Sequence, residues 1–207
     1  MTHSQNDANN TTDTIVLDAI VLAGGRSRRM GEDKALLELN GVPLLQRVCD
    51  VASTCVRQTY VVTPWGDRYS HLNLPATIVC EPERPERARG PLTGFACGLR
   101  VTQSEWVLLL ACDLPCLSTA GLQQGVERLE QVPSDSIAFL HPHPKGWEPL
   151  CGFYRQHCLH SLQQAISTGT RSFQDWLSEQ AIAVWEDADS QLFLNCNTPE
   201  EWLRASK

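Results

Sequence analysis

Short runs of apolar residues alternate along most of the chain with segments of mixed polarity. The run from Trp106 to Cys112 is apolar at every position, which is typical of a strand buried on both faces of a parallel sheet. Apolar and β-branched residues from Ile15 to Leu22 predict a second buried strand, which ends at the pair Gly24-Gly25. Shorter runs predict further strands at 59–62, 77–80, 137–140, 150–154 and 181–185.

Between these strands, the spacing of apolar residues favours helices. The predicted helices cover residues 46–54, 93–101, 119–130, 159–167 and 173–178. A capping box made by Thr198, Pro199 and Glu201 predicts the start of a last helix. Residues 36–45 are predicted to form a short hairpin or tight turn around Asn40-Gly41.

The regular alternation of strands and helices predicts an α/β fold with a mostly parallel, doubly wound sheet and helices on both faces. A chain of 207 residues without internal repeats can form this fold as a single domain. Residues 1–13 are rich in Asn, Thr, Ser and Asp and offer almost nothing to bury, so a disordered tail is expected there. The domain is expected to span residues 14–207.

Charge, hydropathy and cysteine content indicate which partners and which cellular compartment to expect. With 17 Lys and Arg against 24 Asp and Glu, the net charge of −7 argues against a protein that coats nucleic acid or anionic membrane. No apolar run approaches the roughly 20 residues of a membrane span, and the first 14 residues resemble neither a secretory signal nor a transit peptide. Nine cysteines without a CxxC pair fit reduced thiols better than disulfides. We therefore expect a cytoplasmic protein with no nucleic acid and no membrane among its partners.

The segment 22–34 has the chemistry of a phosphate-binding loop. In doubly wound sheets, ligands bind beyond the carboxyl ends of the strands, which is where this segment begins. Its glycines would let backbone N–H groups approach a phosphate, and its cations would balance the charge. Those cations are Arg26, Arg28, Arg29 and Lys34. The spacing matches neither a Walker loop nor GxGxxG, and the plain alternative is a glycine turn with solvated arginines.

Asp113 directly follows the strand predicted to be central. At that place a carboxylate can hold a Mg²⁺ ion that also contacts phosphate oxygens. The plain alternative is an aspartate that stabilises the turn before Pro115. Because a phosphate loop is predicted at the same edge of the sheet, the metal interpretation is favoured.

Two other patterns suggest chemistry less strongly. His141 and His143, with Cys151 or His157, could indicate zinc, but the spacing is not that of a structural zinc site and loop histidines are the better interpretation. Cys112 and Cys116 flank Asp113, yet they do not form the CxxC pair of a redox site.

Four segments together resemble a known family. They read LAGGRSRRMGEDKALLELNGVPLL from Leu22, GPLTG at 90–94, CDLP at 112–115 and NCNTPEEW at 195–202. The chain closely resembles the molybdenum cofactor guanylyltransferases in these segments, which extend from about Ala19 to Trp202. The first segment is the most specific. Residues 133–149 carry no motif of this family, although Trp147-Glu148-Pro149 lies in a predicted loop that could face a pterin.

The resemblance implies a Rossmann-like nucleotidyltransferase fold and a defined reaction. GMP would be transferred from GTP to molybdenum-molybdopterin, with Mg²⁺ as cofactor and pyrophosphate as the second product. It also allows transient contact with proteins that deliver molybdopterin. The alternatives are a molybdopterin cytidylyltransferase, a sugar-phosphate nucleotidyltransferase, or a nucleotide-binding regulator without turnover. Leu-Ala-Gly-Gly in place of the Leu-Ala-Ala-Gly of cytidylyl relatives, and the motif NxNTPE, favour guanine.

The loop chemistry and the matching positions together define a candidate site. Lys34 and Asp113 are the predicted catalytic residues, and Asp113 is the predicted metal ligand. Nucleotide binding is assigned to Leu22, Ala23, Gly24, Gly25, Arg28, Lys34, Gly90, Pro91, Leu92 and Asp113. Asn195 and Asn197 match positions expected on the molybdopterin side.

The chain departs from the family pattern at two positions. Where the family usually has Glu-Asp after the third strand, this chain has Glu81-Pro82, so either Glu81 replaces the aspartate or the contact is missing. Where the family often has Asn after the second strand, this chain has Thr63. Both departures concern contacts with the nucleotide, and neither affects the phosphate loop or the metal ligand.

Overall fold

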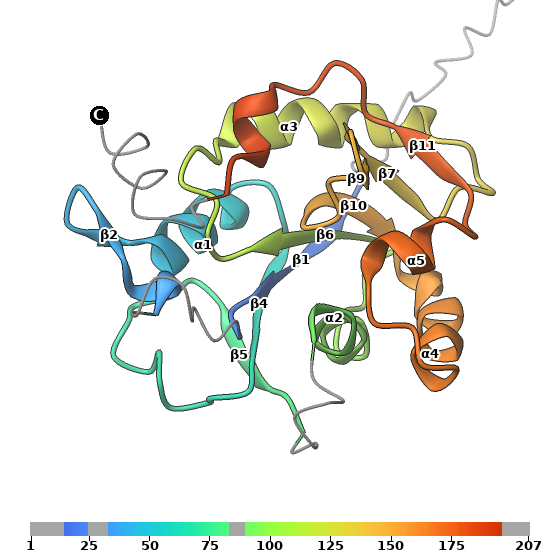
Figure 1. The fold of residues 1–207 in the computed structure, drawn as a ribbon. Helices are drawn as coiled ribbons and strands as arrows, with labels where there is room; N and C mark the ends of the chain where they lie inside the picture. Colours follow the sequence, from blue (N-terminus) through green and yellow to red (C-terminus); the bar gives the residue numbers. More distant parts are fainter. Residues whose placement is uncertain (1–14, 25–32, 83–89, 196–207) are drawn as a thin grey trace, which may run out of the picture.

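A seven-stranded sheet crosses the computed structural model (Figure 1), which describes residues 15–24, 33–82 and 90–195. The strand order is β11-β7-β10-β6-β1-β4-β5. The strands are β1 (Leu17–Leu22), β4 (Gln58–Thr63), β5 (Thr77–Cys80), β6 (Trp106–Ala111), β7 (Ala138–Leu140), β10 (Cys151–Arg155) and β11 (Ile182–Val184). The predicted tail, Gly25, Arg28, Asn197 and the capping box at Thr198 lie outside the described residues.

Six of the seven strands run in one direction, and β10 runs against its two neighbours. β1 pairs in parallel with β4 and β6, and Leu22 lies opposite both Val62 and Ala111. β10 is antiparallel to β6 and to β7, while β11 is again parallel to β7. The prediction of a mostly parallel sheet is confirmed, and the reversal of β10 is a feature that the apolar pattern does not show.

The central strands are buried because both of their faces are apolar. In β6, Trp106, Leu108 and Leu110 belong to one core cluster, whereas Val107 and Leu109 belong to the other. Successive side chains of a strand point to opposite faces, so one apolar run supplies both clusters. The expected burial of this strand on both faces is confirmed.

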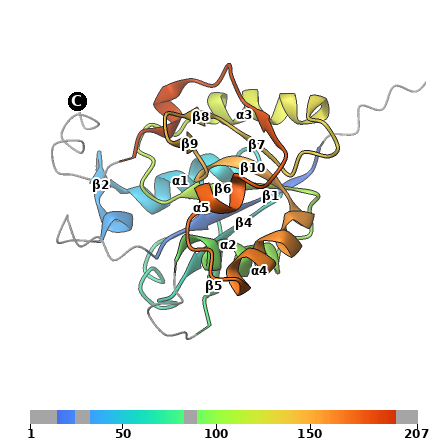
Figure 2. The ribbon, with the colours of Figure 1, turned by 45° about the vertical axis from the view of Figure 1, so that its right-hand side comes forward.

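Helices cover both faces of the sheet, as predicted (Figures 1 and 2). They are α1 (Leu44–Ser53) and α3 (Thr119–Arg128) on one face and α2 (Pro91–Leu99), α4 (Leu159–Ser167) and α5 (Phe173–Leu177) on the other. In α2, Leu92, Phe95, Ala96 and Leu99 are buried, a spacing that places them on one side of the helix. Ser118 and Ser172 cap α3 and α5 through their side-chain oxygens.

The predicted hairpin at 36–45 is correct in its turn and wrong in its length. Asn40 and Gly41 have φ values of 55° and 77°, and they connect the two-residue strands β2 (Glu38–Leu39) and β3 (Val42–Pro43). Lys34–Leu36 form instead a short 3₁₀ helix, η1, and Leu44 already belongs to α1. The structure also has short 3₁₀ helices at Leu129–Gln131 (η3), Gln156–Cys158 (η4) and Ser190–Phe193 (η5).

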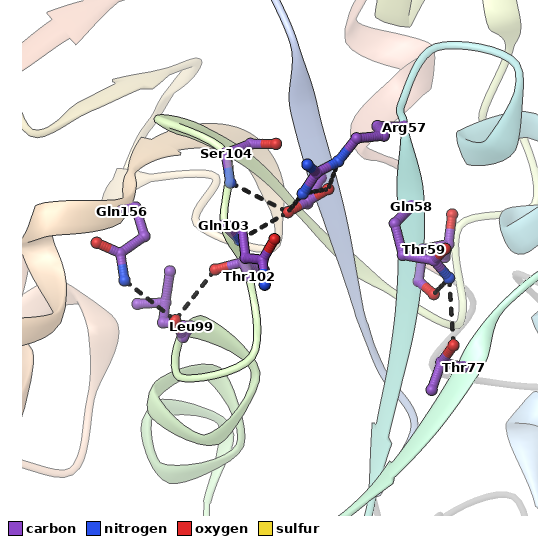
Figure 3. Close-up of polar contacts among 10 residues, drawn as sticks. Arg57, Gln58, Thr59, Thr77, Leu99, Thr102, Gln103, Ser104 and Gln156 are labelled. Atoms are coloured by element: carbon purple, nitrogen blue, oxygen red, sulfur yellow. Dashed lines mark hydrogen bonds and ion pairs between the residues drawn. The ribbon is translucent and has the colours of Figure 1, made fainter.

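At the amino ends of the parallel strands, polar side chains tie several segments together (Figure 3). The carboxylate of Asp18, which is 0% exposed, accepts hydrogen bonds from Arg57 and from the backbone N–H groups of Gln103 and Ser104. The loop before β4 and the loop before β6 are therefore both fixed to β1. This network lies at the edge of the sheet opposite the predicted phosphate loop.

A second small hairpin, β8 (Pro142–His143) with β9 (Gly146–Trp147), connects β7 to β10. It leaves the sheet after Leu140 and returns before Cys151, whose partner on β6 is Leu110. The hairpin therefore stands at the carboxyl edge of the parallel strands, on the side of the C-terminal half of the chain. Within the described residues, no helix has both the length and the apolar character needed to cross a membrane.

Candidate active site

The carboxyl ends of four parallel strands meet at one edge of the sheet. Hydrogen bonds continue one residue beyond the strands, from Ala23 N to Val62 O (2.9 Å), from Glu81 N to Thr63 O (2.8 Å) and from Cys112 N to Leu22 O (3.2 Å). The segments that carry the predicted nucleotide loop and Asp113 are therefore neighbours, as expected from the position of ligand sites in such sheets.

Gly24 lies where the first strand approaches the loop after β4. A Cβ atom built on Gly24 would be 2.9 Å from Cδ of Pro64, so no larger residue fits without displacement of the proline. The same position is 3.6 Å from Oε1 of Glu81, and a Cβ on Gly94 of α2 would be 3.5 Å from that oxygen. The Glu81 carboxylate thus lies between the start of the predicted phosphate loop and the first turns of α2.

Lys34 and Asp113 meet across this edge, although 79 positions separate them in the sequence. Nζ of Lys34 donates to Oδ2 of Asp113 at 2.9 Å, and the two side chains are only 17% and 16% exposed. Lys34 is the last residue of the predicted loop, and Asp113 comes shortly after β6. The structure therefore brings the two predicted catalytic residues together, with opposite charges that can engage a phosphate and a cation.

Asp33, which precedes Lys34, is fixed from both sides. One carboxylate oxygen accepts the N–H of Ala35 at 3.1 Å and caps η1, and the other accepts the hydroxyl of Tyr69 and the guanidinium of Arg68, each at 3.0 Å. The Arg68 guanidinium also lies 3.8 Å above the ring of Trp65. Burial and then the negative charge of Asp33 raise the pKa of Tyr69 well above its usual value, so its hydroxyl remains a donor.

These supporting residues were missed in the sequence analysis. Asp33 stands beside Lys34 within the quoted motif, and its charge was the only sequence signal available. Arg68 and Tyr69 lie 35 and 36 positions further along the chain and belong to no motif.

The first turn of α2 presents backbone groups at the same edge. Pro91 occupies the first helical position and is exposed, and Thr93 closes the turn by accepting the N–H of Gly90 at 3.1 Å. Leu92 is only 2% exposed and packs in the core, so a contact between this residue and a ligand has to use its backbone. The N-terminus of a helix carries a partial positive charge, which suits an anionic ligand.

Thr63 and Cys112 lie beside this edge, the first with a buried hydroxyl and the second with a protonated thiol. Thr63 is 0% exposed, and its Oγ1 accepts the N–H of Trp65 at 3.2 Å, which stabilises the turn after β4. Burial, followed by the charges of Asp113 and Asp33, raises the pKa of Cys112 well above the ordinary thiol value. This thiol therefore stays protonated, and it forms no disulfide with another described cysteine.

The hairpin β8–β9 forms one side of this edge next to Asp113. The backbone N–H of Ala111 donates to Leu150 O at 2.8 Å, and Glu148 N donates to His141 O at 2.9 Å. His143 Nε2 is 3.7 Å from Oε1 of Glu148, whose pKa is raised by burial and lowered to a smaller extent by the two histidines.

Gln174 of α5 fixes this hairpin by pairing with the backbone of Trp147. It accepts the N–H of Trp147 at 3.0 Å and donates to its carbonyl at 2.8 Å. The side chain of Trp147 is half-buried and packs against the core cluster of α2, α4 and α5.

Asn195 lies two residues after Phe193, whose ring stacks on His141 with centroids 4.4 Å apart. Its Oδ1 is buried and accepts no hydrogen bond from any residue that the structure describes. Among the described residues, no three His, Cys, Asp or Glu side chains form a group that could hold a metal. Nδ1 of His141 lies 2.9 Å from the carbonyl oxygen of Trp185, and this contact fixes the orientation of the imidazole ring.

Comparison with known proteins places this chain in a family. The family described as "MobA-like NTP transferase domain" matches residues 19–184. A probable molybdenum cofactor guanylyltransferase of Nostoc sp. is 53% identical over 186 residues, which are 89% of this chain and 88% of that protein. A probable molybdenum cofactor guanylyltransferase of Synechococcus elongatus is 43% identical over 89% of this chain and 95% of its own length.

Solved structures show the same fold. The molybdopterin-guanine dinucleotide biosynthesis protein A of Archaeoglobus fulgidus superposes with a TM-score of 0.75 at 24% identity, over 91% of this chain and 96% of that one. A putative protein of Aquifex aeolicus gives a TM-score of 0.72 at 25% identity, over 90% and 96%. Sequence and fold agree, and the chain is an enzyme that belongs to the MobA-like nucleotidyltransferases and, among them, to the molybdenum cofactor guanylyltransferases.

Proposed function

We propose that this chain transfers GMP from GTP to molybdenum-molybdopterin and forms the guanine dinucleotide form of the cofactor. The contact of Lys34 with Asp113 at the carboxyl edge carries this proposal, because it joins a phosphate-binding cation and a metal-binding carboxylate at one point. Relatives at 43% and 53% identity that are named guanylyltransferases support the choice of guanine.

The nucleotide would occupy the space bounded by the strand ends and the first turn of α2. Leu22, Ala23 and Gly24 would offer backbone groups, and Gly24 would allow the close approach that a side chain would block. Gly90, Pro91 and Leu92 would line the base side. Glu81, which lies against Gly24 and Gly94, is the carboxylate present at this edge where the family usually has the aspartate one position later.

The residues present fit a Mg²⁺ ion shared with the nucleotide. Mg²⁺ is commonly held by one or two protein carboxylates together with substrate phosphates, and it needs no cage of three or more side chains. Asp113 supplies such a carboxylate, partly exposed and beside a cation that also attracts phosphate. When bound, Mg²⁺ would polarise the α-phosphate and neutralise charge that develops on it.

The reaction requires no nucleophile from the protein. A terminal phosphate oxygen of molybdopterin would form a bond to the α-phosphorus of GTP, and the bond from that phosphorus to the bridging oxygen of the β-phosphate would break. The electron pair leaves with pyrophosphate, whose charge Lys34 would stabilise. The chain contributes position and charge, which are the main resources of phosphoryl-transfer enzymes.

The acceptor would lie on the other side of Asp113, against the hairpin β8–β9. Asn195 lies close to this hairpin in the chain of contacts through Phe193 and His141. Its buried Oδ1 accepts no hydrogen bond in the described structure, which suits a residue that orients a polar ligand. Asn197, outside the described residues, is proposed for the same side.

The test is thermal unfolding of the purified full chain with Mg²⁺ and either GTP, CTP or ATP. At 100 times its dissociation constant, GTP should raise the melting temperature by about 5 to 10 °C, since a ligand that binds only the folded state stabilises it by about 2.7 kcal/mol. Asp113→Ala should abolish the part of this shift that depends on Mg²⁺, and it should abolish pyrophosphate release when molybdenum-molybdopterin is added.

Asp135→Ala is the matched control, because it removes an exposed carboxylate before β7, at the opposite edge of the sheet. It should leave the shift and the turnover unchanged. A shift with CTP in place of GTP would overturn the choice of guanine, and pyrophosphate release at the normal rate in Asp113→Ala would overturn the role of that carboxylate.

A further inference from the structure

We propose that Tyr69 is a positioning residue for Lys34, acting through Asp33. This inference rests on the proposed function, because it concerns the lysine that would hold the nucleotide phosphates. Three contacts in sequence carry it: Tyr69 to Asp33, Asp33 to the turn that begins at Lys34, and Lys34 to Asp113.

The first contact joins the phosphate loop to the hydrophobic core. Tyr69 is 1% exposed and belongs to the core cluster that includes α1 and α3, so its ring has one fixed place. Its hydroxyl is 3.0 Å from Oδ2 of Asp33. A hydrogen bond between a buried neutral donor and a carboxylate is stronger than one between neutral groups. The core therefore determines where the Asp33 carboxylate lies.

The second contact transmits this position to the backbone. Oδ1 of Asp33 accepts the N–H of Ala35, and the carbonyl of Asp33 accepts the N–H of Leu36, so Asp33 caps η1 and closes its first turn. The start of η1 sets the direction in which Lys34 leaves the chain. Without a fixed Asp33, the lysine would have to pay more conformational entropy to reach the phosphates.

Arg68 supports the same carboxylate from the solvent side. It is 41% exposed, donates to Oδ2 of Asp33 at 3.0 Å, and has its Cζ 3.8 Å from the ring centroid of Trp65. An exposed ion pair of this kind contributes little by itself. The buried hydroxyl of Tyr69 is therefore the contact whose loss should matter.

The experiment is a double-mutant cycle with Tyr69→Phe and Lys34→Ala, read out as the affinity for Mg²⁺ and GTP. Tyr69→Phe removes one hydroxyl and keeps the ring in the core, so the protein should still fold. We expect the dissociation constant to rise about tenfold in the wild-type background, the scale for one hydrogen bond to a charged group. In the Lys34→Ala background the same substitution should change it less than about twofold, because coupled residues are not additive.

Tyr154→Phe is the matched control. This tyrosine is 0% exposed in the other core cluster, and its hydroxyl donates to Pro149 O at 2.8 Å. The Tyr154→Phe variant loses the same hydroxyl group, and its affinity for GTP should stay within about twofold of the wild-type value. Equal losses from Tyr69→Phe in both backgrounds, or no loss in either, would overturn the proposal.

A second measurement does not depend on nucleotide binding. Hydrogen exchange of the amides of residues 35 and 36 should be at least about tenfold faster in Tyr69→Phe than in the wild type or Tyr154→Phe, because their acceptor Asp33 loses its anchor. Unchanged exchange would refute the positioning role even if the wild type binds no GTP. A wild type that binds no GTP, with the faster exchange present, would refute the proposed function alone.

Discussion

Asp18 and Asp187 both accept a hydrogen bond from an arginine, but their surroundings differ. Asp18 is completely buried, and Arg57 and two backbone N–H groups donate to its oxygens (Figure 3). Asp187 pairs with Arg128 at the surface, where both side chains are more than 40% exposed. Removal of a partner inside the protein leaves donors without water, whereas removal at the surface does not.

We therefore expect Asp18→Ala to lower the free energy of unfolding by about 1 to 3 kcal/mol, because the backbone N–H groups of Gln103 and Ser104 lose their acceptor away from water. Asp187→Ala should lower it by less than about 1 kcal/mol. Urea denaturation of both variants measures the difference. Equal effects of the two substitutions would show that the buried network at Asp18 contributes no more than a surface pair.

The positions of some site residues could be predicted from the sequence, whereas the burial of others could not. The order of strands and loops predicted that the phosphate loop and Asp113 would share one edge of a parallel sheet, and the structure places Lys34 and Asp113 in contact there. It could not indicate that Thr63 turns inward to cap its own loop, or that Leu92 is a core residue within the segment assigned to the base. Burial depends on the residues packed against a position, and one sequence does not name those residues.

At the scale of elements, Gln174 joins the hairpin β8–β9 to α5. Its amide satisfies both backbone groups of Trp147, much as a neighbouring strand would. A Cβ on Gly146, which has φ of 125°, would clash with Oε1 of Gln174, so the glycine makes this approach possible. The hairpin is thereby fixed at a point that its two short strands alone could not fix.

Gln174→Ala should release the hairpin without unfolding the domain. Trypsin should then cleave after the exposed Lys145 at least about tenfold faster than in the wild type, since local opening governs proteolysis of a folded protein. Gln156→Ala, which removes an amide that bonds Leu99 O, should not change this rate. Equal cleavage of the two variants would contradict the role of Gln174.

Most elements could be predicted from the sequence because their patterns are local. The strand at 77–80 and the helix at 159–167 have the predicted bounds. The hairpin at 36–45 was overextended, because Lys34–Leu36 close into a turn around Asp33 and the helix α1 takes Leu44. The local sequence does not indicate the direction of β10, since the apolar pattern of a buried strand is the same in a parallel and in an antiparallel strand.

At the scale of the whole molecule, both core clusters enclose thiols. Cys49 and Cys151 belong to one cluster and Cys158 to the other. Burial raises the pKa of Cys49 and of Cys151 from 9.0 to about 12, with smaller contributions from Asp50 and Glu148 respectively. In the unfolded chain these thiols would lose their protons near pH 9.

The folded state therefore keeps protons that the unfolded state releases, and stability should fall as the pH rises from about 9 to about 12. Each of the two thiols should contribute a loss of about 1.4 kcal/mol per pH unit within this window, and none below it. Urea unfolding at several pH values measures the slope. Cys151→Ala should reduce the slope by one thiol's share, and the exposed Cys80→Ala should not. A slope unaffected by Cys151→Ala would contradict this linkage.

The reversal of β10 has a consequence for how the enzyme can diversify. Because β7 ends and β10 begins at the same edge of the sheet, residues 141–150 leave and re-enter at neighbouring points. Insertions or deletions in that excursion alter a loop without shifting the register of β1, β4 or β6. If the proposed function is right, residues 141–150 can change the part of the site that binds the acceptor, while the part that binds the nucleotide stays the same.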